Sequence, residues 1–245
     1  MRLSKAWIIA LRDFKIFRRQ KMIWYSILIF PIITAVIFPL VMEFGGGRTG
    51  RILVARYPML LDAFSFFFVI GAAFIPLTIA SYSIVGEKIE RSLEPLLATP
   101  ILDSEILLGK TISAFVPVLI SMYTGATLFM ALMDEVTFGK LGYFYFPNWS
   151  IATLLLVLVP VAIILGVEYS VIISSRVNDV RSATGLGIFI FLPFIGIYLA
   201  SEIGLITLDT NTILIISGII LAIDILLFFI ATATFNREEI LTKWK

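Results

Sequence analysis

The chain has 245 residues, of which 60% are apolar and 15% are charged, and its mean hydropathy is +1.03. Soluble domains contain about half apolar and about a quarter charged residues, so this composition excludes an ordinary soluble protein and indicates one embedded in a lipid bilayer. The net charge of +2 gives no sign of nucleic-acid binding, and the absence of cysteine and histidine excludes disulfides, thiolate nucleophiles, histidine bases and the usual zinc and copper sites.

Residues 1–21 form a basic segment with apolar side chains at helical spacing. The apolar side chains are Trp7, Ile8, Leu11, Phe14 and Phe17. The basic side chains between and after them are Lys5, Arg12, Lys15, Arg19 and Lys21. This pattern predicts an amphipathic helix that lies on the membrane surface. The alternative interpretation is a positively charged flank that only fixes the membrane topology.

Six apolar runs are long enough to cross a bilayer, which takes roughly 20 residues in a helix. They are residues 22–42, 63–85, 111–133, 151–173, 184–200 and 212–233. Continuous apolar runs disfavour a β-barrel, whose strands alternate apolar and polar residues. We therefore predict an all-α integral membrane protein with six transmembrane helices. The fifth run is short, so a re-entrant segment within residues 184–211 is an open alternative.

Proline occurs in each of the first five runs, at Pro31, Pro39, Pro76, Pro117, Pro160 and Pro193. Membrane helices tolerate proline because neighbouring helices and polar side chains satisfy the carbonyl that proline leaves free. Such kinks act as hinges or, more often, as fixed packing features.

The polar stretch from Gly86 to Lys110 is the largest water-compatible piece between two predicted spans. A helix over its first half would align an apolar stripe beside an acidic face; the stripe comprises Ile89, Leu93, Leu96 and Leu97, and the face comprises Glu87, Glu90 and Glu94. Pro95 predicts a break near Glu94. Asp103 or Ser104 would then cap a new helix that enters the third span. Both an ordinary solvated connector and a binding site for a cytoplasmic partner fit this composition.

Two acids, Glu168 and Asp224, lie within predicted spans. A charged residue at bilayer depth costs roughly 2.5–3.5 kcal/mol on insertion scales, so both acids should face the bundle interior, a partner or water. They are candidate pathway residues. The alternative is that they are protonated or hydrogen-bonded acids that hold helices together.

The parts of the chain outside the spans are too short to form a domain with its own core. We expect one transmembrane domain over residues 1–245, composed of the amphipathic segment (1–21), helices 1 and 2 (22–85), the polar segment (86–110), helices 3 to 6 (111–233) and a tail (234–245). The side that holds both termini carries 15 of the 19 Lys and Arg residues. The positive-inside rule therefore places both termini and residues 86–110 in the cytoplasm.

The sequence from Glu87 to Pro100, EKIERSLEPLLATP, is followed by EILLGK from Glu105 to Lys110. Together they resemble the signature of ABC-2 type transporter permeases, in which a Glu/Arg-rich run leads to Leu-Glu-x-Leu-Leu-x-Thr-Pro and then to Gly-Lys at the start of the third helix. The stretch lies at the family's position, between helices two and three. Ser92 is a departure, because a Gly-Thr or Lys-Thr pair is common ahead of Leu-Glu.

The resemblance implies the membrane permease subunit of an ATP-binding cassette exporter, in the cell membrane. It implies a separate ABC ATPase subunit that binds ATP and Mg²⁺, and a permease homodimer or heterodimer. Residues 86–110 would contain the cytoplasmic coupling helix; the ATPase-coupling residues would be Glu87, Glu90, Arg91, Leu93, Glu94, Leu96, Leu97, Thr99 and Pro100.

No cofactor and no enzymatic activity are expected in this chain itself. Gly109-Lys110-Thr111 is not a Walker A loop, because Ser104 occupies the position of its first glycine. The alternative function is an ATP-independent secondary transporter or channel that uses Asp224 and Glu168 as a proton or cation relay. That alternative leaves the polar stretch without a task, and no inverted repeat supports it.

Overall fold

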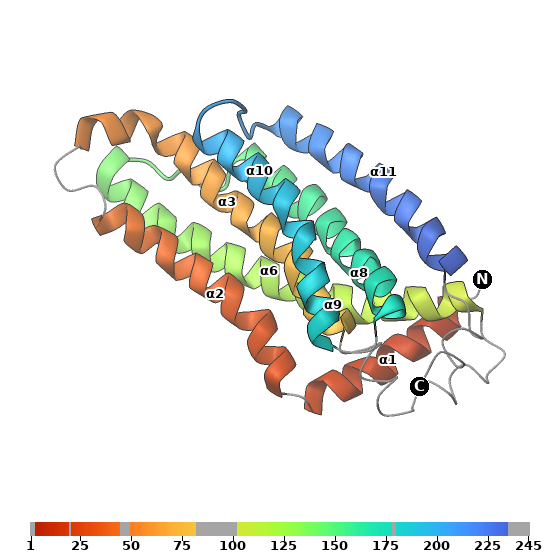
Figure 1. Cartoon of the computed structure of the whole chain (residues 1–245). Coiled ribbons are helices and arrows are strands. Elements are labelled where there is room, and N and C mark those ends of the chain that lie inside the picture. The colour runs from red at the N-terminus through yellow and green to blue at the C-terminus, as the bar shows by residue number, and fades with distance from the viewer. Residues whose placement is uncertain (1–2, 20, 45–49, 82–101, 178–179, 235–245) are drawn as a thin grey trace.

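The computed structural model describes residues 3–19, 21–44, 50–81, 102–177 and 180–234, and all regular structure among them is helical (Figure 1). In chain order, the helices are α1 (Leu3–Arg19), α2 (Lys21–Phe44), α3 (Gly50–Ser81), α6 (Asp103–Leu141), α7 (Trp149–Thr153), the π-helical turn η2 (Leu154–Leu158), α8 (Val159–Arg176), α9 (Val180–Gly187), the 3₁₀ turn η3 (Ile188–Ile190), α10 (Phe191–Glu202) and α11 (Thr210–Thr234).

Six of these helical stretches are long and apolar enough to cross a membrane. They are Ile23–Phe44, Pro58–Ile79, Ser104–Lys140, Trp149–Ser174, Gly185–Glu202 and Thr210–Thr232. The predicted all-helical fold with six spans is therefore confirmed. Figure 1 shows α9 and α10 following one another along the length of the bundle, so the short fifth run has the extent of a span.

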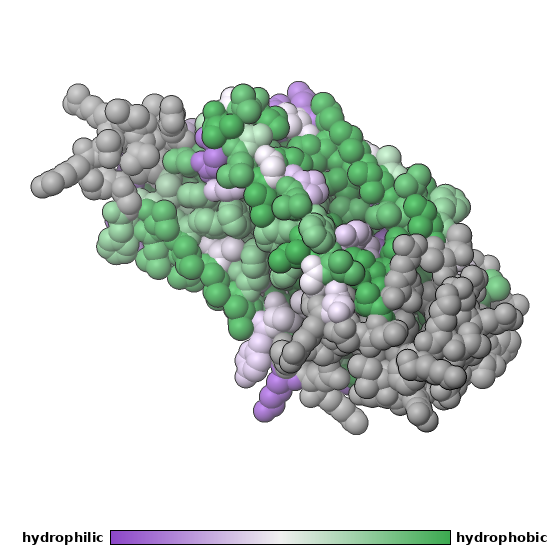
Figure 2. All heavy atoms as spheres, in the orientation of Figure 1, coloured by the Kyte–Doolittle hydropathy of each residue, from purple (hydrophilic) through white to green (hydrophobic). Residues whose placement is uncertain are grey.

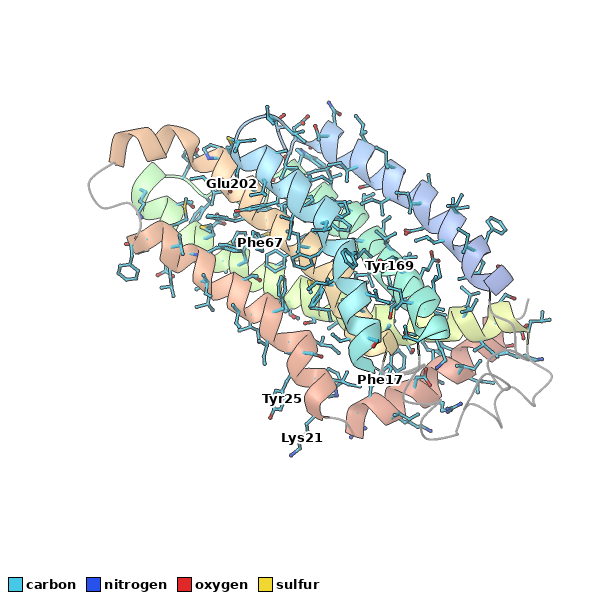
Figure 3. All side chains as sticks on the ribbon, viewed as in Figure 1. Phe17, Lys21, Tyr25, Phe67, Tyr169 and Glu202 are labelled. Carbon is cyan, nitrogen blue, oxygen red and sulfur yellow. The ribbon has the colours of Figure 1, made fainter. Side chains whose placement is uncertain are left out.

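α3 is the central helix of the bundle. It contacts α2, α6, α8 and α10, and its span is 78% buried, whereas the spans in α2 and α11 are 33% and 22% buried. Aromatic rings fill part of this interior, as where Phe67 of α3 meets Tyr198 of α10 at 4.8 Å between centroids (Figure 3). Apolar side chains cover most of the described bundle surface that Figure 2 shows, which suits contact with lipid.

α1 lies across one end of the bundle, where Figure 3 places Phe17 and Lys21, and Glu202 lies toward the opposite end. The helix predicted for the N-terminal segment is present as α1, and its predicted place on the membrane surface stays a prediction. The side chains that α1 buries are Ala6, Ile9, Ala10, Asp13 and Phe17, whereas Trp7, Ile8 and Leu11 are exposed. Small residues allow α1 to approach α6 closely, a contact that the sequence analysis did not predict.

Candidate functional site

The predicted coupling residues lie outside the described part of the chain, and their role stays a prediction. The described structure resumes at Leu102, immediately before α6. Here Glu105 Oε2 accepts a hydrogen bond from the Leu102 backbone N–H at 3.2 Å, and the Leu102 carbonyl accepts from the Glu105 N–H at 2.9 Å. The N-terminus of α6 is thus capped by the Glu105 side chain, as in one half of a capping box. The sequence had suggested Asp103 or Ser104 as the capping residue.

A buried charged cluster joins the first turns of α6 to α1. Lys110 Nζ lies 3.9 Å from Asp13 Oδ2, and each of these side chains is only 2% exposed. Ser113 Oγ lies 3.3 Å from the same Asp13 oxygen and 2.8 Å from the Lys110 carbonyl oxygen, so its single proton serves one acceptor at a time. Breaking a buried ion pair by removing one partner typically costs about 3–5 kcal/mol, so this cluster fixes α1 to α6.

Gly109 makes this contact close. A Cβ atom at Gly109 would lie 2.8 Å from the backbone oxygen of Ala6 and 2.8 Å from Cβ of Ile9. Such distances leave no room for a side chain, and the neighbouring atom is backbone and cannot swing away. α1 and the start of α6 therefore form one packed unit, directly after the segment that resembles a coupling helix.

The two intramembrane acids lie on neighbouring helices. Glu168 belongs to α8 and Asp224 to α11, which contact each other, and these residues are 7% and 3% exposed. Within the described residues, both carboxylate oxygens of Asp224 and Oε2 of Glu168 have no hydrogen-bond partner.

Asp224 occupies the only side of α11 that is packed against the bundle. The side chains buried along this stripe are Ile213, Ser217, Ile220, Asp224 and Ala231. Ser217 Oγ donates a hydrogen bond to the Ile213 carbonyl at 2.7 Å, so its hydroxyl has a partner within its own helix. The carboxyl of Asp224 therefore faces α8. The other buried side chains of this side of α11 are apolar, except for Ser217, which bonds within α11.

A second polar cluster, at the opposite end of the bundle, was missed by sequence reasoning. Asp134 Oδ1 accepts hydrogen bonds from the backbone N–H groups of Tyr145 at 3.0 Å and Phe146 at 2.9 Å, and the Tyr145 side chain lies near Asp62. Burial, together with the charge of Asp62, raises the pKa of Tyr145 above its usual value, so its hydroxyl stays protonated. Asp62 directly precedes one predicted span and Asp134 directly follows another, and this position at the ends of spans was the feature of the sequence that could have indicated the cluster.

The Asp134 cluster fastens the α6–α7 loop across the ends of α3 and α6. The Tyr145 hydroxyl also lies 3.2 Å from the Pro58 carbonyl oxygen. Nearby, Lys140 Nζ donates to the Met42 carbonyl at 2.6 Å and lies 3.3 Å from Glu43 Oε2, which closes the end of α2. These contacts close the ends of helices, and the described residues contain no group of three or more acids, histidines or cysteines that could hold a metal ion.

Comparison with known protein families finds one match over nearly the whole chain. The model of a family described as "ABC-2 family transporter protein" matches residues 7–236, from α1 through the end of α11. No curated protein matches the chain.

Proposed function

The chain belongs to the ABC-2 family of transporter proteins and is a membrane permease of an ABC-type transporter; from this premise we propose that a separate ATPase subunit drives it and that it exports its substrate. The observation that carries the proposal is the family match over residues 7–236, which takes in all six candidate spans. The connections between spans are too short for an ATPase domain. ATP and Mg²⁺ would therefore bind to the partner chain.

The end of the bundle that holds α1 would face the cytoplasm, because that side carries most of the Lys and Arg residues. Residues 86–110 would bind the ATPase there. Lys110, Asp13 and Gly109 support this proposal, since they make α1 and the start of α6 one unit next to that segment. ATP binding would move the coupling segment, and the movement would pass into α6 and α1. Two permeases and two ATPases would form the working assembly and alternate between two packings.

Asp224 and Glu168 would belong to the translocation pathway or its lining. Two carboxylates at a contact between membrane helices repel each other when both are charged, and hydrocarbon offers no water to screen them. A proton or a cation between them would relieve that repulsion. The ATP-independent relay that also explains these acids has no support from the family match, which is to an ABC-type transporter.

The test of ATPase coupling reverses the acidic face of residues 86–110. The double variant Glu90→Lys/Glu94→Lys should remain in the membrane but lose the ATPase during purification in mild detergent, because reversed charges at a contact repel the partner. Glu135→Lys is the control, an exposed acid near the opposite end of α6, and it should retain the ATPase. Recovery of the ATPase with the double variant at the unaltered yield would refute this docking site.

A further inference from the structure

Two prolines leave backbone carbonyls in α2 and η2 without their helical donors. In an α-helix each N–H bonds to the carbonyl four residues earlier, and proline has no N–H. Pro31 therefore leaves the Ile27 carbonyl free. The turn before Pro160 is π-helical, with bonds spanning five residues, as the bond from the Val159 N–H to the Leu154 carbonyl shows. The next bond in this register would run from residue 160 to the Leu155 carbonyl, and Pro160 cannot supply it.

Hydroxyl groups of α6 bind both of these carbonyls. Ser121 Oγ donates to the Ile27 carbonyl oxygen at 2.8 Å, and the Tyr123 hydroxyl donates to the Leu155 carbonyl oxygen at 3.0 Å. An unsatisfied backbone group in the hydrocarbon region costs several kcal/mol. Each hydroxyl of α6 therefore takes the place of the backbone N–H donor that proline lacks in the neighbouring helix.

The Ser121 contact is reinforced one turn further along α6. A Cβ atom at Gly125 would overlap the Pro31 ring. Only glycine at position 125 therefore leaves room for Pro31 to pack against α6. Ser121 and Gly125 lie on the same face of α6, since they are four residues apart. The Pro31 turn of α2 therefore packs on α6 through a hydrogen bond on one turn of α6 and through contact with the proline ring on the next.

The neighbouring hydroxyls of Thr124 and Thr127 in α6 bond within their own helix. Thr124 Oγ1 donates to the Ser121 carbonyl at 2.9 Å, and Thr127 Oγ1 donates to the Tyr123 carbonyl at 2.8 Å. Hydroxyls in helices usually bond back to their own helix in this manner. Ser121 and Tyr123 differ because they bond across to carbonyls that proline has freed.

We propose that Ser121 and Tyr123 are positioning residues that couple α6 to the carbonyls left free by Pro31 of α2 and Pro160 of α8, so that both helices follow α6 when it moves. The transport role of this coupling rests on the proposed function, in which α6 begins directly after the ATPase-binding segment. Movement that enters at the Lys110 end of α6 would reach α2 and α8 through these two hydroxyls. The sequence contained the prolines but did not indicate which neighbours serve them.

The decisive test is a double-mutant cycle on the purified full-length permease in detergent. Ser121→Ala should lower the unfolding midpoint by about 2–4 °C, because one buried carbonyl loses its donor. Pro31→Ala restores a backbone N–H to that carbonyl, so Ser121→Ala should have little effect in the Pro31→Ala background. Tyr123→Phe and Pro160→Ala should show the same relation. The crossed pair, Ser121→Ala with Pro160→Ala, is the matched control and should be additive.

Ser121→Thr, which keeps the hydroxyl, and Thr124→Ala, whose hydroxyl serves its own helix, should both behave like the unaltered chain. These two variants keep the test informative if a proline variant fails to fold. An equal effect of Ser121→Ala and Thr124→Ala, or of Ser121→Ala with and without Pro31, would overturn the proposal.

A distance measurement separates positioning from simple stabilisation. The chain has no cysteine, so spin labels can be attached at Val41→Cys in α2 and Phe138→Cys in α6, whose side chains are exposed. Ser121→Ala should broaden the distance distribution between the labels, and Pro31→Ala should narrow it again. An unchanged distribution in Ser121→Ala would also overturn the proposal. Both measurements use the permease alone, so failure to find an ATPase would contradict the proposed function without deciding this inference.

Discussion

Asp224 and Glu168 show what a single side chain contributes when it is buried between membrane helices. Both are more than nine-tenths buried, and three of their carboxylate oxygens have no hydrogen-bond partner within the described residues. The buried ion pair of Lys110 and Asp13 is the opposite case, since there each charge meets its counterpart. The first pair stays the candidate pathway site, and the second joins α1 to α6.

Asp224→Asn distinguishes a pathway role of this acid from a structural one. The amide keeps the shape and hydrogen-bonding capacity of a protonated carboxyl but cannot ionise. If ionisation matters, the variant should still assemble with the ATPase, but ATP hydrolysis by the complex should lose its response to pH and to added monovalent cations. Hydrolysis is measured between about pH 5 and pH 9, with Glu43→Gln, a half-exposed acid, as the control. A response identical to that of the unaltered complex would reduce Asp224 to a helix-packing residue.

At the scale of elements, apolar periodicity identified the helices but not their ends or partners. The sequence predicted that a helix begins at Asp103 or Ser104 and enters a span over 111–133, and α6 begins at Asp103 but continues to Leu141. The polar turn after residue 133 falls below the hydropathy of a span, so the end of α6 was missed. The packing of α1 against α6 was not predicted. It depends on Ala6, Ala10 and Gly109, whose small size matters only once a second helix is in place.

Gly166 in α8 provides a test of this close packing. A Cβ atom there would overlap the backbone oxygen of Ala73 beside Pro76 in α3, so Gly166→Ala should separate α8 from α3 and lower stability by 1–3 kcal/mol, about the usual cost of overpacking. Gly218 in α11 has open space around it, and Gly218→Ala should be neutral or stabilising, because alanine favours helix by about 1 kcal/mol. Thermal unfolding in detergent measures both. Equal midpoints for the two variants would contradict the packing described for α3 and α8.

For the whole molecule, composition and six apolar runs were sufficient to predict the fold class, and one polar stretch was sufficient to suggest the family. Asp62 and Asp134 were missed because their partners, Tyr145 and Phe146, lie in a loop whose path over the helix ends depends on tertiary structure. The same holds for the pairing of Ser121 with Pro31 and of Tyr123 with Pro160. The sequence shows which backbone carbonyls lose their helical donor to proline. Only the tertiary structure shows which side chain donates a hydrogen bond in its place.

The central claim is that this permease works with a separate ATPase, and native mass spectrometry of the tagged chain tests it most directly. The chain is extracted from the membranes of its own cells in mild detergent, and the intact complex is weighed with and without ATP and Mg²⁺. We expect two permease chains bound to two ABC ATPase chains, with nucleotide bound to the ATPase. A chain that transports while it carries no nucleotide-binding partner would contradict the account.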